Sequence, residues 1–314
     1  MDKLLKKFKS DDFKEVVDFY SNFDTSNDII KWLKMLPSAP VKFFERGKDS
    51  DIVIVVTTPD HNSINAYKTE LLFKEFKIIF VESSGPYFHL SKAVNLGIHE
   101  ASKHNPKWII YSNDDLYKIE NTSLLKEQLL SLNHKNIDVV FRRNHKNMQR
   151  NSNVSYLQHI GLRNIFLSQL ISNMVQKTTK EYLNLLEKFN MPFIMYDSTA
   201  KPFRRFYTRM LMKSKPLEFP GFSRLFIFNK KYASKHDQIF DEIYRNGSDD
   251  LDLDLSLYLD KVKYDFVNFN IGEYGGITLG RGLSRVFRDI ANAAYFSDKF
   301  KNKGLIKILQ NVKS

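Results

Sequence analysis

The stretch DIVIVVTT, residues 51–58, decides the fold. It is an almost unbroken run of β-branched side chains, with no polar residue between Asp51 and Thr57. A strand that is apolar on both faces is typical of the interior of a parallel sheet, where helices cover both sides. We therefore expect an α/β protein built around this strand.

Helical and strand patterns alternate after this stretch. The pattern predicts helices at 63–75, 88–103 and 121–132, and strands at 76–83, 107–112 and 136–143. Strand starts are roughly 25 to 30 residues apart, the spacing of βαβ crossovers. These elements predict a doubly wound sheet, in which a ligand sits outside the carboxyl ends of the strands.

The rest of the chain lacks this alternation. We expect five segments: a helical extension at 1–50, an α/β half at 51–143, a helical insertion at 144–215, a second half at 216–283 and an amphipathic basic helical tail at 284–314. The second half contains an apolar strand within 216–232 and an acidic helix. The tail either lies on an anionic membrane surface or packs back on the protein.

Composition narrows the functional classes. The 314 residues include no cysteine, which excludes disulfides and thiolate metal sites. A net charge of +12 favours phosphate-bearing substrates, polyanions or anionic membranes. No stretch approaches the ~18 apolar residues of a membrane span. We expect a cytoplasmic protein, with the tail as its one candidate for peripheral contact with the inner membrane surface, and no specific nucleic-acid binding.

Polar residues gather where the predicted strands end. Thr57, Thr58 and Asp60 follow the first strand, Glu82 ends the second, and the third, KWIIYS, stops at Asn113-Asp114-Asp115. Two adjacent carboxylates repel unless a partner or cation compensates them, and Mg²⁺ or Mn²⁺ suits such oxygen ligands. The alternative is that these residues cap the next helix.

A second acidic group lies in GSDDLDLDLSLYLD, residues 247–260. Asp249, Asp250, Asp252 and Asp254 exceed what capping of a helix needs, although first-turn acids also complement the helix dipole. One of them could act as a general base if it faces the strand ends. The chain has neither a G-x-x-x-x-G-K-[ST] loop nor a G-x-G-x-x-G turn, so a metal would have to carry most of the charge of a bound diphosphate.

The order of these motifs resembles the family 2 glycosyltransferases of GT-A fold. The resemblance rests on DIVIVVTTPD, IIFVESSG, the Asn-x-Gly of LSKAVNLGIHEA, YSNDD in place of a DxD motif, and IFDEIYRNGSDDLDL. It covers roughly residues 51–143 and 216–285, and it implies a Rossmann-like nucleotide-diphospho-sugar transferase sheet flanked by helices.

The resemblance also implies roles for individual residues. Asp115, with Asp114, would hold Mn²⁺ or Mg²⁺ against the diphosphate of a sugar donor. Asp250 would be the base that activates a glycan, lipid-linked or protein acceptor, with Asp249 and Asp252 as alternates. The residues expected to contact the nucleotide are Thr57, Thr58, Asp60, Glu82, Lys92, Asn113 and Asp114. The implied reaction is inverting, metal-dependent hexosyl transfer in glycan biosynthesis.

The chain departs from the family pattern at two places. Asn113 replaces the first acid of DxD, and no histidine follows the acidic helix, where a Gly-rich loop with Arg281 stands instead. Two other classes stay open. One is a nucleotidyltransferase, although TTPDHNS carries no Gly, Lys or Arg to hold a triphosphate. The other is a non-catalytic protein of the same fold that binds nucleic acid or a membrane surface.

Overall fold

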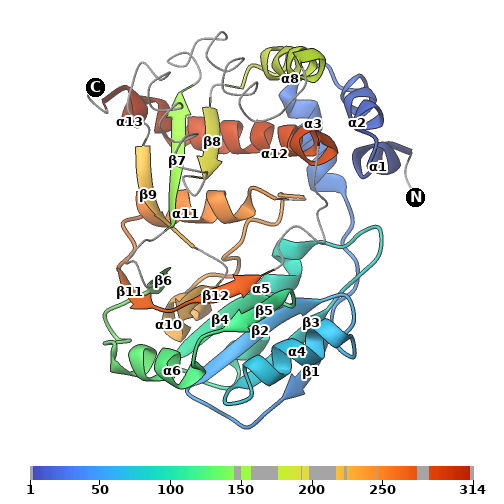
Figure 1. The fold of residues 1–314 in the computed structure, drawn as a ribbon. Helices are drawn as coiled ribbons and strands as arrows, with labels where there is room; N and C mark the ends of the chain where they lie inside the picture. Colours follow the sequence, from blue (N-terminus) through green and yellow to red (C-terminus); the bar gives the residue numbers. More distant parts are fainter. Residues whose placement is uncertain are drawn as a thin grey trace.

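The computed structural model describes residues 3–144, 150–156, 176–191, 193–197, 217–222, 225–245, 247–273 and 283–311. In this part of the chain, one large sheet with flanking helices forms the lower half of the molecule in Figure 1. A small sheet and a group of helices form the upper half.

The large sheet has seven strands (Figure 1). In spatial order they are β1 (Lys42–Arg46), β3 (Lys77–Glu82), β2 (Ile52–Thr58), β4 (Trp108–Asn113), β10 (Phe226–Asn229), β6 (Val139–Arg143) and β11 (Tyr264–Asn268). The four strands predicted from the alternating pattern, β2, β3, β4 and β6, are confirmed. The central strand β2 pairs in parallel with β3 and β4, as its β-branched run predicts.

Two strands make the sheet mixed, which corrects the expectation of a parallel sheet. β10 lies antiparallel between β4 and β6. Its residues are buried on both faces, so their composition resembles that of a parallel strand and does not reveal its direction. β1 is an antiparallel edge strand within the segment expected to be helical; its three charged residues, Lys42, Glu45 and Arg46, suit an edge.

Helices cover both faces of this sheet. On one face, α5 (Leu90–Ser102), α10 (Lys230–Lys235) and α11 (Asp249–Leu259) share a core with Val53 and Val55. On the other, α4 (Ile64–Leu72) and α6 (Thr122–Ser131) pack on Ile52, Ile54 and Val56. The side chains of β2 therefore alternate between two cores, which is why nearly every residue of the strand is apolar.

A short ribbon follows β4. β5 (Leu116–Ile119) pairs antiparallel with β12 (Ile271–Glu273), and α6 begins only after Asn121, which caps it. Asn113-Asp114-Asp115 therefore leads into a strand, and the interpretation of these residues as a helix cap is wrong.

The described residues of the predicted helical insertion form two strands as well as a helix. β7 (Arg150–Tyr156) pairs antiparallel with β8 (Phe193–Asp197) and with β9 (Leu217–Gly221). One helix of the insertion is confirmed, α8 (Gln176–Lys188). The other helical pattern begins at residue 161, and its residues up to 175 lie outside the described part of the chain. The apolar segment 216–232 was expected as one strand, yet it divides into β9 and β10, which belong to different sheets.

The two ends of the described chain share a third core. α2 (Phe13–Tyr20) and α3 (Ser26–Met35) pack against the C-terminal α12 (Leu283–Asn302), and α1 (Lys3–Phe8) packs on α2. α13 (Leu305–Asn311) packs on α12 and adds apolar residues to the same core. Their apolar residues at helical spacing, such as Phe19 and Phe287, are fully buried. The tail thus takes the second of its two predicted arrangements and packs back on the protein.

Candidate active site

The predicted strand-end residues meet at one rim of the large sheet. The register aligns Thr57 of β2 with Asn113 of β4, and Thr58 with Glu82 of β3. Both threonines are buried, whereas Glu82 and Asn113 are half-buried. The prediction that these residues share the carboxyl ends of adjacent strands is therefore confirmed.

Tyr111 lies at the centre of this rim. Its hydroxyl donates to Asn113 Oδ1 at 2.6 Å and lies 3.4 Å from Thr57 Oγ1. Burial raises the pKa of this hydroxyl, and the charges of Asp249, Asp115 and Asp114 raise it further. Asp114, Asp115 and Asp249, from the two acidic groups, therefore lie near enough for their charges to act on one neutral hydroxyl. Tyr111 was missed in the sequence because it reads as an ordinary strand aromatic.

Asp114 and Asp115 leave the end of β4 side by side and half-buried. Thr58 Oγ1 donates to Asp114 Oδ2 at 2.7 Å. Burial raises the pKa of Asp114, and the neighbouring charge of Asp115 adds to this rise. Two carboxylates that disfavour each other's ionised form, with no helix to cap, fit a divalent cation.

The second acidic group begins at a strained turn. Gly247 and Ser248 have φ values of +126° and +67°, and Ser248 immediately precedes α11. A non-glycine residue in this region costs stability, so the turn must be held by its surroundings. Asn292 of α12 holds it, because its side-chain amide donates to the Gly247 carbonyl at 2.9 Å and accepts from Arg245 N–H at 3.0 Å.

Asp249 is the member of this group that faces the rim. It is buried, and Ser91 Oγ at the start of α5 donates to its Oδ2 at 3.3 Å. Burial raises the pKa of Asp249 well above its usual range, and the charge of Asp250 raises it further. The side chain of Asp250 is half-buried beside it. Ser91, like Tyr111, carried no signal in the sequence beyond its place next to Lys92.

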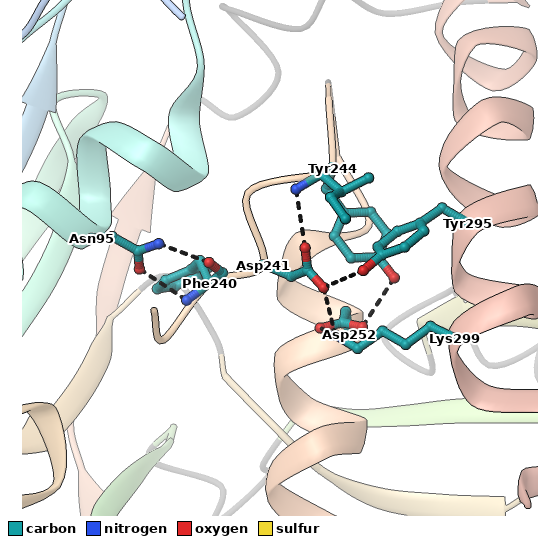
Figure 2. A network of polar contacts seen from close by, with 8 residues as sticks. Asn95, Phe240, Asp241, Tyr244, Asp252, Tyr295 and Lys299 are labelled. Carbon is teal, nitrogen blue, oxygen red and sulfur yellow. Dashed lines mark hydrogen bonds and ion pairs between the residues drawn. The ribbon is translucent and has the colours of Figure 1, made fainter. Parts of the chain in front are cut away.

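Asp252 has a different environment. It accepts from the Tyr244 hydroxyl at 3.0 Å and from Lys299 Nζ at 2.7 Å (Figure 2). Lys299 also contacts Asp241 Oδ2 at 2.8 Å, and Tyr295 donates to the same oxygen at 2.7 Å. These contacts join α11, the 238–245 loop and α12. Asp252 therefore holds the framework, and of the three predicted bases it is the one engaged away from the rim.

The Asn-x-Gly motif of α5 has a structural explanation. Asn95 donates to the carbonyl of Phe240 at 2.8 Å and to Glu242 Oε1 at 3.0 Å, and its own Oδ1 accepts from the N–H groups of Ile239 and Phe240 (Figure 2). A Cβ on Gly97 would lie 2.5 Å from side-chain carbons of both Val55 and Val81. The motif thus fixes the 239–242 loop and lets α5 lie close on the sheet.

Asp289 of α12 also belongs to this end of α11. Burial raises the pKa of Asp289 to about 7. The charge of Arg285 opposes this rise, whereas the charges of Asp250 and Asp249 add to it. Its Oδ1 is buried and has no hydrogen-bond partner within the described residues. Nothing in the sequence singles out Asp289, because it lies in a segment whose pattern predicts a basic amphipathic helix.

A second polar group lies at the ends of β2 and β3. Asp60, His61 and Glu82 bring potential metal-ligand atoms within 4.8 Å of one another, the one group of three found in the part of the chain described. His61 Nδ1 lies 2.6 Å from Glu82 Oε2, and its ring stacks on Phe44 at 3.4 Å. Asp60 and Glu82 were predicted to contact the nucleotide; His61 was not.

Two further predicted elements stand apart from these contacts. Lys92 is half-buried in the first turn of α5. Burial lowers the pKa of His89, and the charges of Arg245 and Lys92 lower it further. The Gly-rich loop with Arg281 lies outside the described residues.

Comparison with known proteins adds no family. No protein-family model and no curated protein matches this chain. Among the helices that the structure describes, none has the length and apolar character needed to cross a membrane.

Proposed function

We propose that the protein transfers a sugar from a nucleotide-diphosphate sugar to an acceptor hydroxyl, with inversion and with the help of Mn²⁺ or Mg²⁺. One observation carries the proposal. Asp114 and Asp115 after β4 and Asp249 at the start of α11, more than a hundred residues apart in the sequence, lie near enough for their charges to act on the hydroxyl of Tyr111. Metal-dependent inverting transfer can use carboxylates that hold the cation at the donor and a separate carboxylate as the base at the acceptor.

The donor would lie along the rim. Thr57, Asp60 and Glu82 would contact the nucleoside, because they lie at the ends of β2, which pairs with β4, and of β3, which pairs with β2. Asp114 and Asp115 are the residues that would hold the cation, which would neutralise charge on the leaving diphosphate. The Thr58 hydroxyl fixes one oxygen of Asp114 and leaves the rest of that carboxylate for a ligand.

The base would come from α11. A carboxylate there takes the proton of the acceptor hydroxyl, the acceptor oxygen bonds to the anomeric carbon, and the bond from that carbon to the diphosphate breaks, with its electron pair leaving on the diphosphate. The resemblance pointed to Asp250, but Asp249 is the acid that contacts Ser91 and whose charge reaches Tyr111. Its raised pKa suits a base that works near neutral pH. We therefore place Asp249 first and Asp250 second.

A thermal-shift panel of UDP, GDP, CDP and dTDP, each with and without Mn²⁺, tests the donor site. A nucleotide at a hundred times its dissociation constant should stabilise the protein by about 2.7 kcal/mol. We expect one nucleotide to act only with Mn²⁺ and Asp115→Ala to lose the response. Asp51→Ala is the matched control, because Asp51 pairs with Lys107 at the opposite ends of β2 and β4. If no nucleotide stabilises the wild type, the proposal fails.

A further inference from the structure

A pocket of about 460 Å³ lies beside the candidate active site. It is bounded by the end of α3, the start of α5, the 238–245 loop and α12. Its lining includes the charged side chains of Lys34, Asp241, Glu242 and Arg245 and the polar side chains of Ser38 and His89. Its volume falls in the range of small-molecule sites, roughly 300–1,000 Å³.

Contacts within the protein hold the polar wall of this pocket, and Figure 2 shows those of Asp241. Tyr295 and Lys299 hold Asp241 from α12, and Asn95 holds Glu242 from α5. Arg245 donates to the Leu36 carbonyl at 2.8 Å, and Ser38 Oγ lies 2.9 Å from His89 Nδ1. Side chains that are already ordered lose little conformational freedom on binding, which favours a specific ligand.

The charges in the wall of the pocket limit the chemical class of the ligand. Asp241 and Glu242 would repel a phosphate or nucleotide, whereas Lys34 and Arg245 would repel a cation. An apolar ligand would strip water from four charged groups. Burial lowers the pKa of His89 to about 3, so this residue adds no charge. A neutral ligand with many hydroxyls remains, because each hydroxyl both donates and accepts hydrogen bonds.

The pocket is connected to the candidate base through two helices. His89 caps α5, and Ser91, two residues further on, contacts Asp249. Asp252, which shares Lys299 with the pocket residue Asp241, lies one turn after Asp249 on α11. The wall of the pocket is therefore linked to Asp249 through His89 and Ser91 on α5, and to the helix that carries Asp249 through Lys299.

We infer that this pocket binds a sugar ring of the acceptor, so that the acceptor is a carbohydrate. The inference rests on the proposed function and adds the substrate class to it. Glu242 and Asp241 accept from the ring hydroxyls, and Arg245 donates to them.

The absence of cysteine from the chain allows a reversible block of the pocket. Ser38→Cys is labelled with benzyl methanethiosulfonate, and dithiothreitol then removes the label. Ser234→Cys, at an exposed position of α10, is labelled as the matched control. Saturation-transfer NMR measures the binding of methyl glycosides of glucose, galactose, mannose, N-acetylglucosamine and rhamnose, with free serine as a zwitterionic comparison. The nucleotide panel described above is run on the wild type from the same preparation.

We expect at least one glycoside to bind the wild type and the unlabelled Ser38→Cys variant. Labelling at position 38 should weaken its binding by at least about tenfold, the loss of one hydrogen bond to a charged group, and dithiothreitol should restore it. The label at position 234 should have no effect. Binding of no glycoside, binding that ignores the label at position 38, or binding of serine alone would each overturn the inference. The nucleotide response of the wild type separates this failure from failure of the proposed function.

Discussion

Replacement of Lys299 by methionine should lower the free energy of unfolding by about 3 kcal/mol. The ammonium lies 2.7 Å from Asp252 Oδ2 and 2.8 Å from Asp241 Oδ2. The side chain of Asp252 is only 4% exposed, and that of Asp241 is 17% exposed. Removal of one partner from a buried ion pair costs about 3–5 kcal/mol, and the partial exposure of Asp241 places this case at the lower end.

The dependence on pH follows from the groups involved. Burial lowers the pKa of Lys299, but Asp252 and Asp241 more than reverse this and leave it raised above 10.5. The stabilisation by Lys299 is therefore complete below pH 10.5 and is lost as the pH rises through the raised value. In the variant, both acids lose the cation that favours their charged form. Its deficit should shrink as the pH falls toward 4, because the two acids can then bind protons.

Urea unfolding followed by fluorescence of the buried Trp32 and Trp108 measures these changes. Lys299→Arg, which keeps the charge, is the control. The double variant Lys299→Met with Asp252→Asn should recover at least about half of the lost stability, because it removes the most buried of the uncompensated charges. A loss below about 1 kcal/mol for Lys299→Met, or no recovery in the double variant, would refute the assigned role of Lys299.

Three further predictions concern the site and the helix that supports it. Asp249→Asn should slow sugar transfer by about 10²–10⁴-fold, and a smaller effect than that of Asp250→Asn in the same assay would exchange their roles. Gly97→Ala should lower the free energy of unfolding in urea by about 1–3 kcal/mol, because its Cβ would lie 2.5 Å from side-chain carbons of Val55 and Val81. Ser102→Ala, at the last residue of the same helix, is the comparison. Asp289, with a pKa of about 7 in the folded protein against 3.8 when unfolded, should make the free energy of unfolding fall as the pH rises from about 4 to 7. Asp289→Asn should flatten this slope by up to about 1.4 kcal/mol per pH unit. An unchanged slope would show that Asp289 ionises normally.

The centre of the fold could be predicted because its sequence signal is local. β2, β3 and β4 are short apolar runs separated by helices with ordinary caps, such as Ser63 before α4. Burial on both faces requires apolar side chains at successive positions, and this pattern is visible within eight residues. The polar residues at the strand ends could be placed at one rim for the same reason, because parallel strands end at the same edge.

The antiparallel strands could not be predicted, because pairing partners far apart in the sequence decide them. β10 lies between β4 and β6 in the large sheet, although in the sequence it follows the three strands of the small sheet. Its Phe-Ile-Phe run would suit either direction. β7 is rich in Asn and Ser, which usually indicate loops, yet it pairs with two strands, and its buried Ser152 donates to Asp254 of α11 at 2.7 Å. Tertiary contacts override the local preference of that segment.

The half of the site that depends on α12 was hidden for a related reason. The sequence showed a basic amphipathic helix, and its basic residues are common on solvated or membrane-facing surfaces. In the structure the Lys299 side chain is only 18% exposed between two acids, and Asn292 holds the turn into α11. Because Ser248 in that turn has an unfavourable φ, the position of Asp249 depends on this helix, which is contributed from forty residues further along the chain. Any change that detaches α12 should therefore affect the candidate base before it affects the strand-end acids of β4, which the large sheet holds by itself.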